Sequence, residues 1–220
     1  MKNKINISVF TVICVLCPLT ALATPTGLNN IPTSDVVPKK VLVLQGIAEV
    51  GNDNKPDYFT GFKYGLLENL EVGLDGRIFP ESGLEETLTG QMKYRFELTD
   101  LDAVAFGVAN LGDRAKTGFE DYYLAYSHNF NWVRLHLGGS LQRDNEGGFV
   151  GIDKTVKFLG RDWTWRADFK QSNDAHDTIS SIGFIYDLGH NVLMESWVSF
   201  PTQEGKEEFT TIKINYVFKF

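Results

Sequence analysis

Apolar and polar residues alternate with a period of two along most of this chain. The final stretch, residues 207–220, shows the pattern most clearly. One face of this stretch carries Thr210, Ile212, Ile214, Tyr216, Phe218 and Phe220, and the other carries Thr211, Lys213, Asn215, Val217 and Lys219. Val217 is the one apolar residue on the second face. Such alternation predicts a half-buried strand that runs to the last residue.

Similar segments of about ten residues precede this strand. They cover residues 40–50, 58–67, 70–79, 87–98, 101–111, 120–127, 132–143, 149–158, 162–171, 178–187 and 191–200. The connectors alternate between two to four residues and about six or seven residues, the longer kind including 51–57, 112–118 and 172–177. Short turns that alternate with longer loops are typical of transmembrane barrels. The pattern predicts an all-β fold, a closed antiparallel up-and-down transmembrane β-barrel of about 12 strands with short periplasmic turns. The last strand is expected to close on the first.

The N-terminus has the features of a secretory signal peptide. Lys2 and Lys4 precede an apolar run over residues 5–19, and small residues at 21 and 23 predict cleavage before Thr24. Residues 1–23 are therefore expected to be removed. Both cysteines, Cys14 and Cys17, lie inside this peptide, so the mature chain is expected to form no disulfide.

The remaining chain divides into an extended, proline-containing periplasmic leader over residues 24–39 and a barrel over residues 40–220. Proline fixes φ and donates no ladder hydrogen bond, which disfavours a strand in the leader. The leader is expected to lie across the periplasmic mouth or to enter the lumen. No stretch after residue 23 has the eighteen consecutive apolar residues of a spanning helix. If the chain spans a membrane, it does so as a closed barrel.

The net charge of the chain bears on whether nucleic acid is a partner. The formal net charge is −7 with the signal peptide included, which disfavours nucleic acid. The expected location is the outer membrane, with outer-membrane lipid and the barrel-insertion machinery as partners and small solutes as candidate cargo.

The two strand faces differ in charge, which predicts which of them meets lipid. The apolar face is nearly free of charge, and many aromatic residues lie near strand ends, as in the girdles of membrane barrels. Lys154 breaks the apolar pattern, through a bulge or by snorkelling to an interface. The strand with Tyr122, Tyr123 and Tyr126 is not oriented by its pattern.

The opposite face is predicted to line the lumen. Its charged and titratable residues are Lys63, Glu71, Asp75, Arg77, Lys93, Arg95, Glu97, Arg134, His136, Asp153, Arg166, Asp168, Lys170, Glu195 and Lys213. Two interpretations of this set stay open. The charges form a salt-bridged filling that keeps the barrel rigid, or they line a narrow aqueous pore and steer small solutes. A barrel of twelve strands is intermediate in width between small barrels, which side chains fill, and large barrels, which leave an aqueous channel. Strand number therefore does not decide between the two interpretations.

Catalytic and cofactor motifs are absent from the sequence. It contains no nucleophile elbow, zinc-protease motif, phosphate-binding loop or dinucleotide fingerprint. His176 lies in an acidic loop with Asp174 and Asp177, and His128 has Ser127 and Asn129 beside it. Neighbouring strand residues point to opposite faces, so the second group is not expected to converge. We expect no enzyme activity, no cofactor and no metal.

Two features resemble known bacterial barrels. The terminal phenylalanine, with a tyrosine four residues before it, resembles the closing strand of outer-membrane barrels, which implies that Tyr216, Phe218 and Phe220 act as an assembly signal. The leader TPTGLNNIPTSDVVPKK, the hairpin YGLLENLEVGLDG and the segment MKYRF resemble small outer-membrane barrels of the YjbH type. That family implies a link to exopolysaccharide secretion.

The leading hypothesis is a porin-like narrow channel for small solutes. The alternative is a non-conducting structural or accessory barrel linked to envelope or exopolysaccharide export. A barrel hydrolase is the third and least favoured function.

Overall fold

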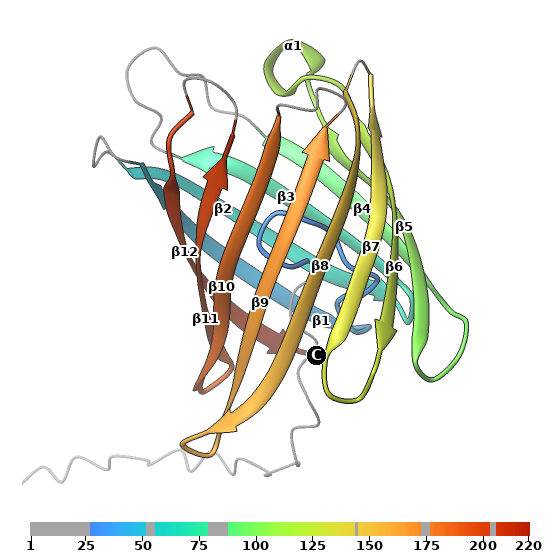
Figure 1. The fold of residues 1–220 in the computed structure, drawn as a ribbon, viewed down its shortest axis with the longest axis vertical. Coiled ribbons are helices and arrows are strands. Elements are labelled where there is room, and N and C mark those ends of the chain that lie inside the picture. The colour runs from blue at the N-terminus through green and yellow to red at the C-terminus, as the bar shows by residue number, and fades with distance from the viewer. Residues whose placement is uncertain (1–26, 52–55, 79–87, 144, 173–176, 203–205) are drawn as a thin grey trace, which may run out of the picture.

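The computed structural model describes residues 27–51, 56–78, 88–143, 145–172, 177–202 and 206–220 (Figure 1). The predicted signal peptide and the loop residues Asp174 and His176 lie outside these ranges. The described strands are β1 (Val41–Val50), β2 (Pro56–Leu67), β3 (Leu70–Ile78), β4 (Leu88–Glu97), β5 (Asp102–Leu111), β6 (Asp121–Asn129), β7 (Arg134–Gln142), β8 (Asn145–Phe158), β9 (Arg161–Ser172), β10 (Thr178–Gly189), β11 (Val192–Pro201) and β12 (Phe209–Lys219). One helical turn, α1 (Arg114–Thr117), follows β5.

Each strand pairs antiparallel with the next, and β12 pairs with β1 to close the ring. The fold class predicted from the alternation is confirmed, and so is the closure of the last strand on the first. The connectors after the even strands gather at one end of the barrel, which we call the turn end. The C-terminal ends of the odd strands, and α1 after β5, lie at the opposite end, which we call the loop end (Figure 1).

Strand β8 is longer than its pattern predicted. The prediction began it at Phe149, whereas it starts at Asn145, which leaves only residues 143–144 between β7 and β8. The added residues include Gly147 and Gly148. They pair with Ser140 and Gly139 of β7, because a ladder hydrogen bond needs only the backbone of each residue.

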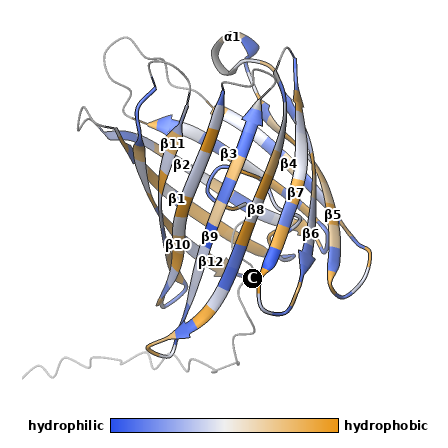
Figure 2. Cartoon of the chain, viewed as in Figure 1, coloured by the Kyte–Doolittle hydropathy of each residue, from blue (hydrophilic) through white to orange (hydrophobic). Residues whose placement is uncertain are grey.

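Apolar and polar residues alternate along the strands of the barrel, as the orange and blue bands show (Figure 2), and many of the apolar ones are exposed on its outer face. Ile212, Ile214 and Tyr216 of β12 are exposed there, while the alternate residues Lys213 and Asn215 are buried inside. Alternate apolar residues on the other strands give the same pattern, so the ring presents an apolar belt of the kind that contacts lipid.

Two features left open by the sequence are placed by the structure. The β8–β9 register is continuous from Gly147 to Phe158, so Lys154 points outward between Ile152 and Val156, near the turn end, without a bulge. In β6, Tyr122 is 47% exposed and Tyr123 only 7%, which places Tyr123 inside and Tyr122 outside. None of the helices among the described residues is long and apolar enough to cross a membrane.

Candidate functional site: the barrel interior and its leader

The leader enters the barrel. From Lys40, next to β1 at the turn end, residues 27–39 run back into the ring of strands, where Figure 1 shows them as the blue coil inside the barrel. Val36 and Val37 near its base and Leu28 and Ile31 near its far end are all buried. The leader therefore occupies the interior from the turn end into the half nearer the loops.

The far end of the leader is a tight turn. Leu28 N–H donates to the carbonyl of Ile31 at 2.9 Å, which places Asn29 and Asn30 at the tip. Asp168 of β9 accepts both tip backbone N–H groups on one carboxylate oxygen, at 2.8 and 3.0 Å. The wall thus holds the tip by its backbone, as a carboxylate holds the start of a helix.

The side chains of the tip reach two further strands. Asn29 Nδ2 donates to Ser181 Oγ of β10 at 2.8 Å, and Asn30 Nδ2 donates to Ser199 Oγ of β11 at 3.0 Å. These serines were not among the predicted lumen residues. Their signal in the sequence is small polar residues that alternate with outward apolar ones along β10 and β11.

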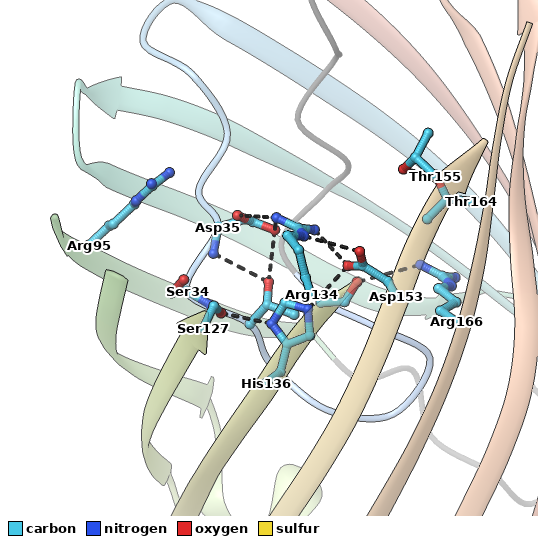
Figure 3. Close-up of polar contacts among 12 residues, drawn as sticks. Ser34, Asp35, Arg95, Ser127, Arg134, His136, Asp153, Thr155, Thr164 and Arg166 are labelled. Carbon is cyan, nitrogen blue, oxygen red and sulfur yellow. Dashed lines mark hydrogen bonds and ion pairs between the residues drawn. The ribbon is translucent and has the colours of Figure 1, made fainter. Parts of the chain in front are cut away.

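Asp35 anchors the middle of the leader to the opposite wall (Figure 3). Its carboxylate lies 3.0 Å from Arg134 NH1 of β7, and its carbonyl accepts from Lys93 Nζ of β4 at 2.9 Å. Nearer the base, Val37 N–H donates to the buried carboxylate of Glu71 at 2.8 Å. The leader is therefore bonded to both sides of the ring and obstructs its lumen.

Ser127, His136 and Asp153 form a chain of polar contacts on the adjacent strands β6, β7 and β8 (Figure 3). Ser127 Oγ lies 2.7 Å from His136 Nδ1, and His136 Nε2 lies 3.1 Å from Asp153 Oδ2. The prediction had considered His128 beside Ser127. The structure instead places Ser127 opposite His136, while His128 Nδ1 contacts Asp102.

This serine–histidine–aspartate chain has the residue types of a hydrolase triad but serves to hold the leader. Ser127 Oγ accepts the backbone N–H of Ser34 at 3.1 Å and is buried beneath it. Asp153 is also held by Arg134, which donates to both of its carboxylate oxygens. A nucleophilic serine needs open access for substrate and donors for an oxyanion. The contacts here instead fix the wall to the leader.

A second buried network lies at the seam of the barrel, where β12 pairs with β1 to close the ring. Glu195 of β11 accepts from Arg166 of β9 at 2.5 Å, from Lys213 of β12 at 3.0 Å and from Asn215 Nδ2 at 2.6 Å. Asn215 in turn accepts from Gln45 Nε2 of β1 at 2.8 Å. Buried charges are tolerated when they are paired and hydrogen-bonded, as these are.

The other predicted lumen residues lie toward the two ends. Asp75 accepts from Gln91 Nε2 at 3.1 Å, and at the loop end Arg77 lies 3.5 Å from Asp57. Arg95 and Glu97 form a 3.2 Å pair at the turn end, with the Glu97 side chain 65% exposed to solvent. The predicted set is thus split between buried networks and exposed ends.

A cavity of about 280 Å³ lies between the leader tip and the loop end. Residues 27–32 form part of its lining, and Lys63, Lys170 and Lys213 contribute ammonium-bearing side chains to it. Asp121 is the acidic side chain of the lining and lies 3.9 Å from Lys170 Nζ. This arrangement favours small anions over cations. Within the described residues, no group of three metal-binding side chains is assembled.

These features define the class of the molecule as a closed 12-stranded antiparallel β-barrel with an apolar outer face and a charged interior. No protein-family model matches the sequence, and no curated protein matches it.

Solved structures of porins share the fold. The KdgM porin aligns with a TM-score of 0.61 at 11% identity, covering 80% of this chain and 99% of that protein. A KdgM porin in complex with disordered oligogalacturonate aligns with a TM-score of 0.58 at 11% identity, covering 81% of this chain and 99% of that one. The NanC porin aligns with a TM-score of 0.52 at 10% identity, with 81% and 99% covered. The predicted resemblance to small porin-like outer-membrane barrels is confirmed at the level of the fold, and the resemblance to YjbH-type barrels stays a prediction.

Proposed function

We propose that this protein is an outer-membrane, porin-like narrow channel for small solutes. The observation that carries the proposal is the loop-side cavity with its three lysines, enclosed by a ring whose outer face is apolar. Charged side chains that line the inside of a closed barrel select solutes by the sign of the solute's charge. A barrel with a purely structural role needs no such cavity.

The cavity supports acidic solutes as the substrate class. Lys63, Lys170 and Lys213 line it together with Gln91, which offers an amide for hydrogen bonds to hydroxyl or carboxylate groups. A KdgM porin of the same fold is described in complex with disordered oligogalacturonate, which is a polymer of acidic sugars. We therefore propose small carboxylate-bearing solutes, such as acidic sugars, as cargo.

Conductance of the refolded protein in planar lipid bilayers tests the channel. Discrete current steps with a preference for anions are expected. The double variant Lys63→Glu/Lys170→Glu should shift the reversal potential in a salt gradient toward cation preference. Lys157→Glu is the matched control, because Lys157 is 70% exposed at the turn end beside Asp162 and lies outside the cavity. A complete lack of current steps, both from the native protein and from a folded variant that lacks residues 27–36, would refute the channel.

One observation favours the alternative function. The leader occupies the lumen, which is what a non-conducting accessory barrel linked to envelope or exopolysaccharide export would show. That barrel would conduct neither with its leader nor without it. The hydrolase gains no support from the interior, because the backbone of Ser34 covers Ser127 Oγ.

A further inference from the structure

We propose that residues 27–36, here named the gate segment, form a releasable gate that closes the lumen and leaves it as one unit. This inference rests on the proposed channel function and adds how the channel is held shut. The segment lies across the path between the loop-side cavity and the turn end, and its tip residues form part of the cavity lining. A solute that enters from the loop end therefore meets the gate segment beside the lysines.

The base of the leader stays fixed while the gate segment is attached by separate contacts. Val37 packs with Val41, Val43, Ile185, Leu193 and Val217 in an apolar cluster between the leader and four strands. Lys40 N–H donates to the carbonyl of Gly65, and Val41 N–H donates to the carbonyl of Pro38. These contacts attach residues 37–40 to the wall. The hinge is therefore expected between Val36 and Val37.

The wall keeps its own charge pairs when the gate segment leaves. Arg134 retains both carboxylate oxygens of Asp153, and Asp168 retains the hydroxyl of Ser181 at 2.5 Å. Glu195 is held by Arg166, Lys213 and Asn215, all of them on strands. Asp35 is the acidic side chain of the gate segment, and it moves into water on release. Release thus leaves none of these wall carboxylates buried without a partner, which removes one barrier to such a movement.

The docking of the tip is also incomplete. Asn29 Oδ1 is buried without a hydrogen-bond partner among the described residues. A buried polar atom without a partner weakens the state that buries it, so this atom favours release.

Glycines in the wall form the recess that receives the tip. A Cβ added at Gly151 of β8 would lie 2.4 Å from Leu28 Cδ1 and 2.7 Å from Ile31 Cδ1. A Cβ at Gly183 of β10 would lie 2.9 Å from Asn29 Oδ1. A side chain at position 151 would therefore compete directly with the gate segment. It would alter no charged group of the wall.

Three variants test the gate in planar bilayers. Deletion of residues 27–36 and the substitution Gly151→Leu should each raise the fraction of time that the channel conducts. Asn30→Ala, which removes the bond to Ser199, should raise the ratio of open to closed time roughly fivefold, the usual worth of one net hydrogen bond. Heat-modifiable gel migration verifies that each variant is a folded barrel.

A reversible lock tests the same gate in a barrel of full length. The pair Asn30→Cys/Ser199→Cys, treated with a short bifunctional methanethiosulfonate, should lose its current steps and regain them on reduction. Asn30→Cys alone, treated in the same way, is the matched control and should keep conducting.

The outcomes separate the gate from the channel. Current steps that are identical in the native protein, the deletion and the cross-linked pair would overturn the gate and leave the channel intact. No steps from any folded variant would overturn both. The expected result is a longer open time on deletion and a loss of current steps on cross-linking.

Discussion

Replacing Glu195 with alanine is expected to cost far more stability than any single substitution at an exposed end of the barrel. The Glu195 side chain is 0% exposed and accepts hydrogen bonds from Arg166, Lys213 and Asn215. Its removal leaves the guanidinium of Arg166, also 0% exposed, without its counter-charge. Removing one partner of a buried ion pair typically costs about 3–5 kcal/mol.

The lower part of that range is expected for this protein. Lys213 borders the cavity and gains water there, and the Arg166 guanidinium lies 5.5 Å from the Trp197 ring centroid, which stabilises a cation. Glu195→Gln should cost less than Glu195→Ala, because the amide oxygen still accepts one of the three bonds.

Urea unfolding of the refolded barrel in detergent micelles measures the effect. Tryptophan fluorescence reports it, since Trp197 is inside the barrel beside Arg166. Stabilities should be compared through the transition midpoints at equal denaturant slope.

Glu97→Ala is the matched control for this experiment. It removes the same charge from an ion pair at the turn end, where Arg95 and Glu97 lie 3.2 Å apart and the Glu97 side chain is 65% exposed. Exposed pairs contribute about 0–1 kcal/mol. The reasoning is refuted if Glu195→Ala destabilises the barrel no more than Glu97→Ala does.

Two further predictions concern the outer face and the end of the chain. Leu137→Arg places a charge on the exposed apolar face and should cost about 2–4 kcal/mol in lipid vesicles, whereas the same change at Leu159, in a turn, should cost less than about 1 kcal/mol. Equal costs at the two positions would contradict the lipid-facing assignment. Deletion of Phe220, which is exposed, should reduce assembly into outer membranes with little change in the urea midpoint in detergent. Normal assembly of the shortened chain, followed by heat-modifiable migration in membrane fractions, would refute its role as a signal.

The fold was predictable because the pattern that defines it is local. Ile212 and Lys213 differ in polarity and point to opposite faces, and this period-2 contrast recurs in strand after strand. Alternating connector lengths then imply an even ring. A signal of this kind needs no information about distant contacts.

The contacts of the interior were less predictable, because they depend on register and on distant residues. The turn predicted at 128–131 lies instead over residues 130–133, between β6 and β7. A turn displaced by two residues moves every cross-strand partner by four, so Ser127 faces His136 and not Trp132. The contact of Asp35 with Arg134 joins residues 99 positions apart, and no local pattern encodes it.

The seam network has a consequence for how the ring finds its correct closure. Gln45 of β1 lies directly opposite Asn215 of β12, and their amides are hydrogen-bonded. A slip of two residues would keep every side chain on its proper face, so the apolar pattern alone would not reject it. It would place Gln45 opposite Lys213 or Val217 and break its hydrogen bond with Asn215, which stays bonded to Glu195 of β11. The buried amide pair therefore favours one register of β1 on β12 over its two-residue slips, where the two ends of the barrel meet.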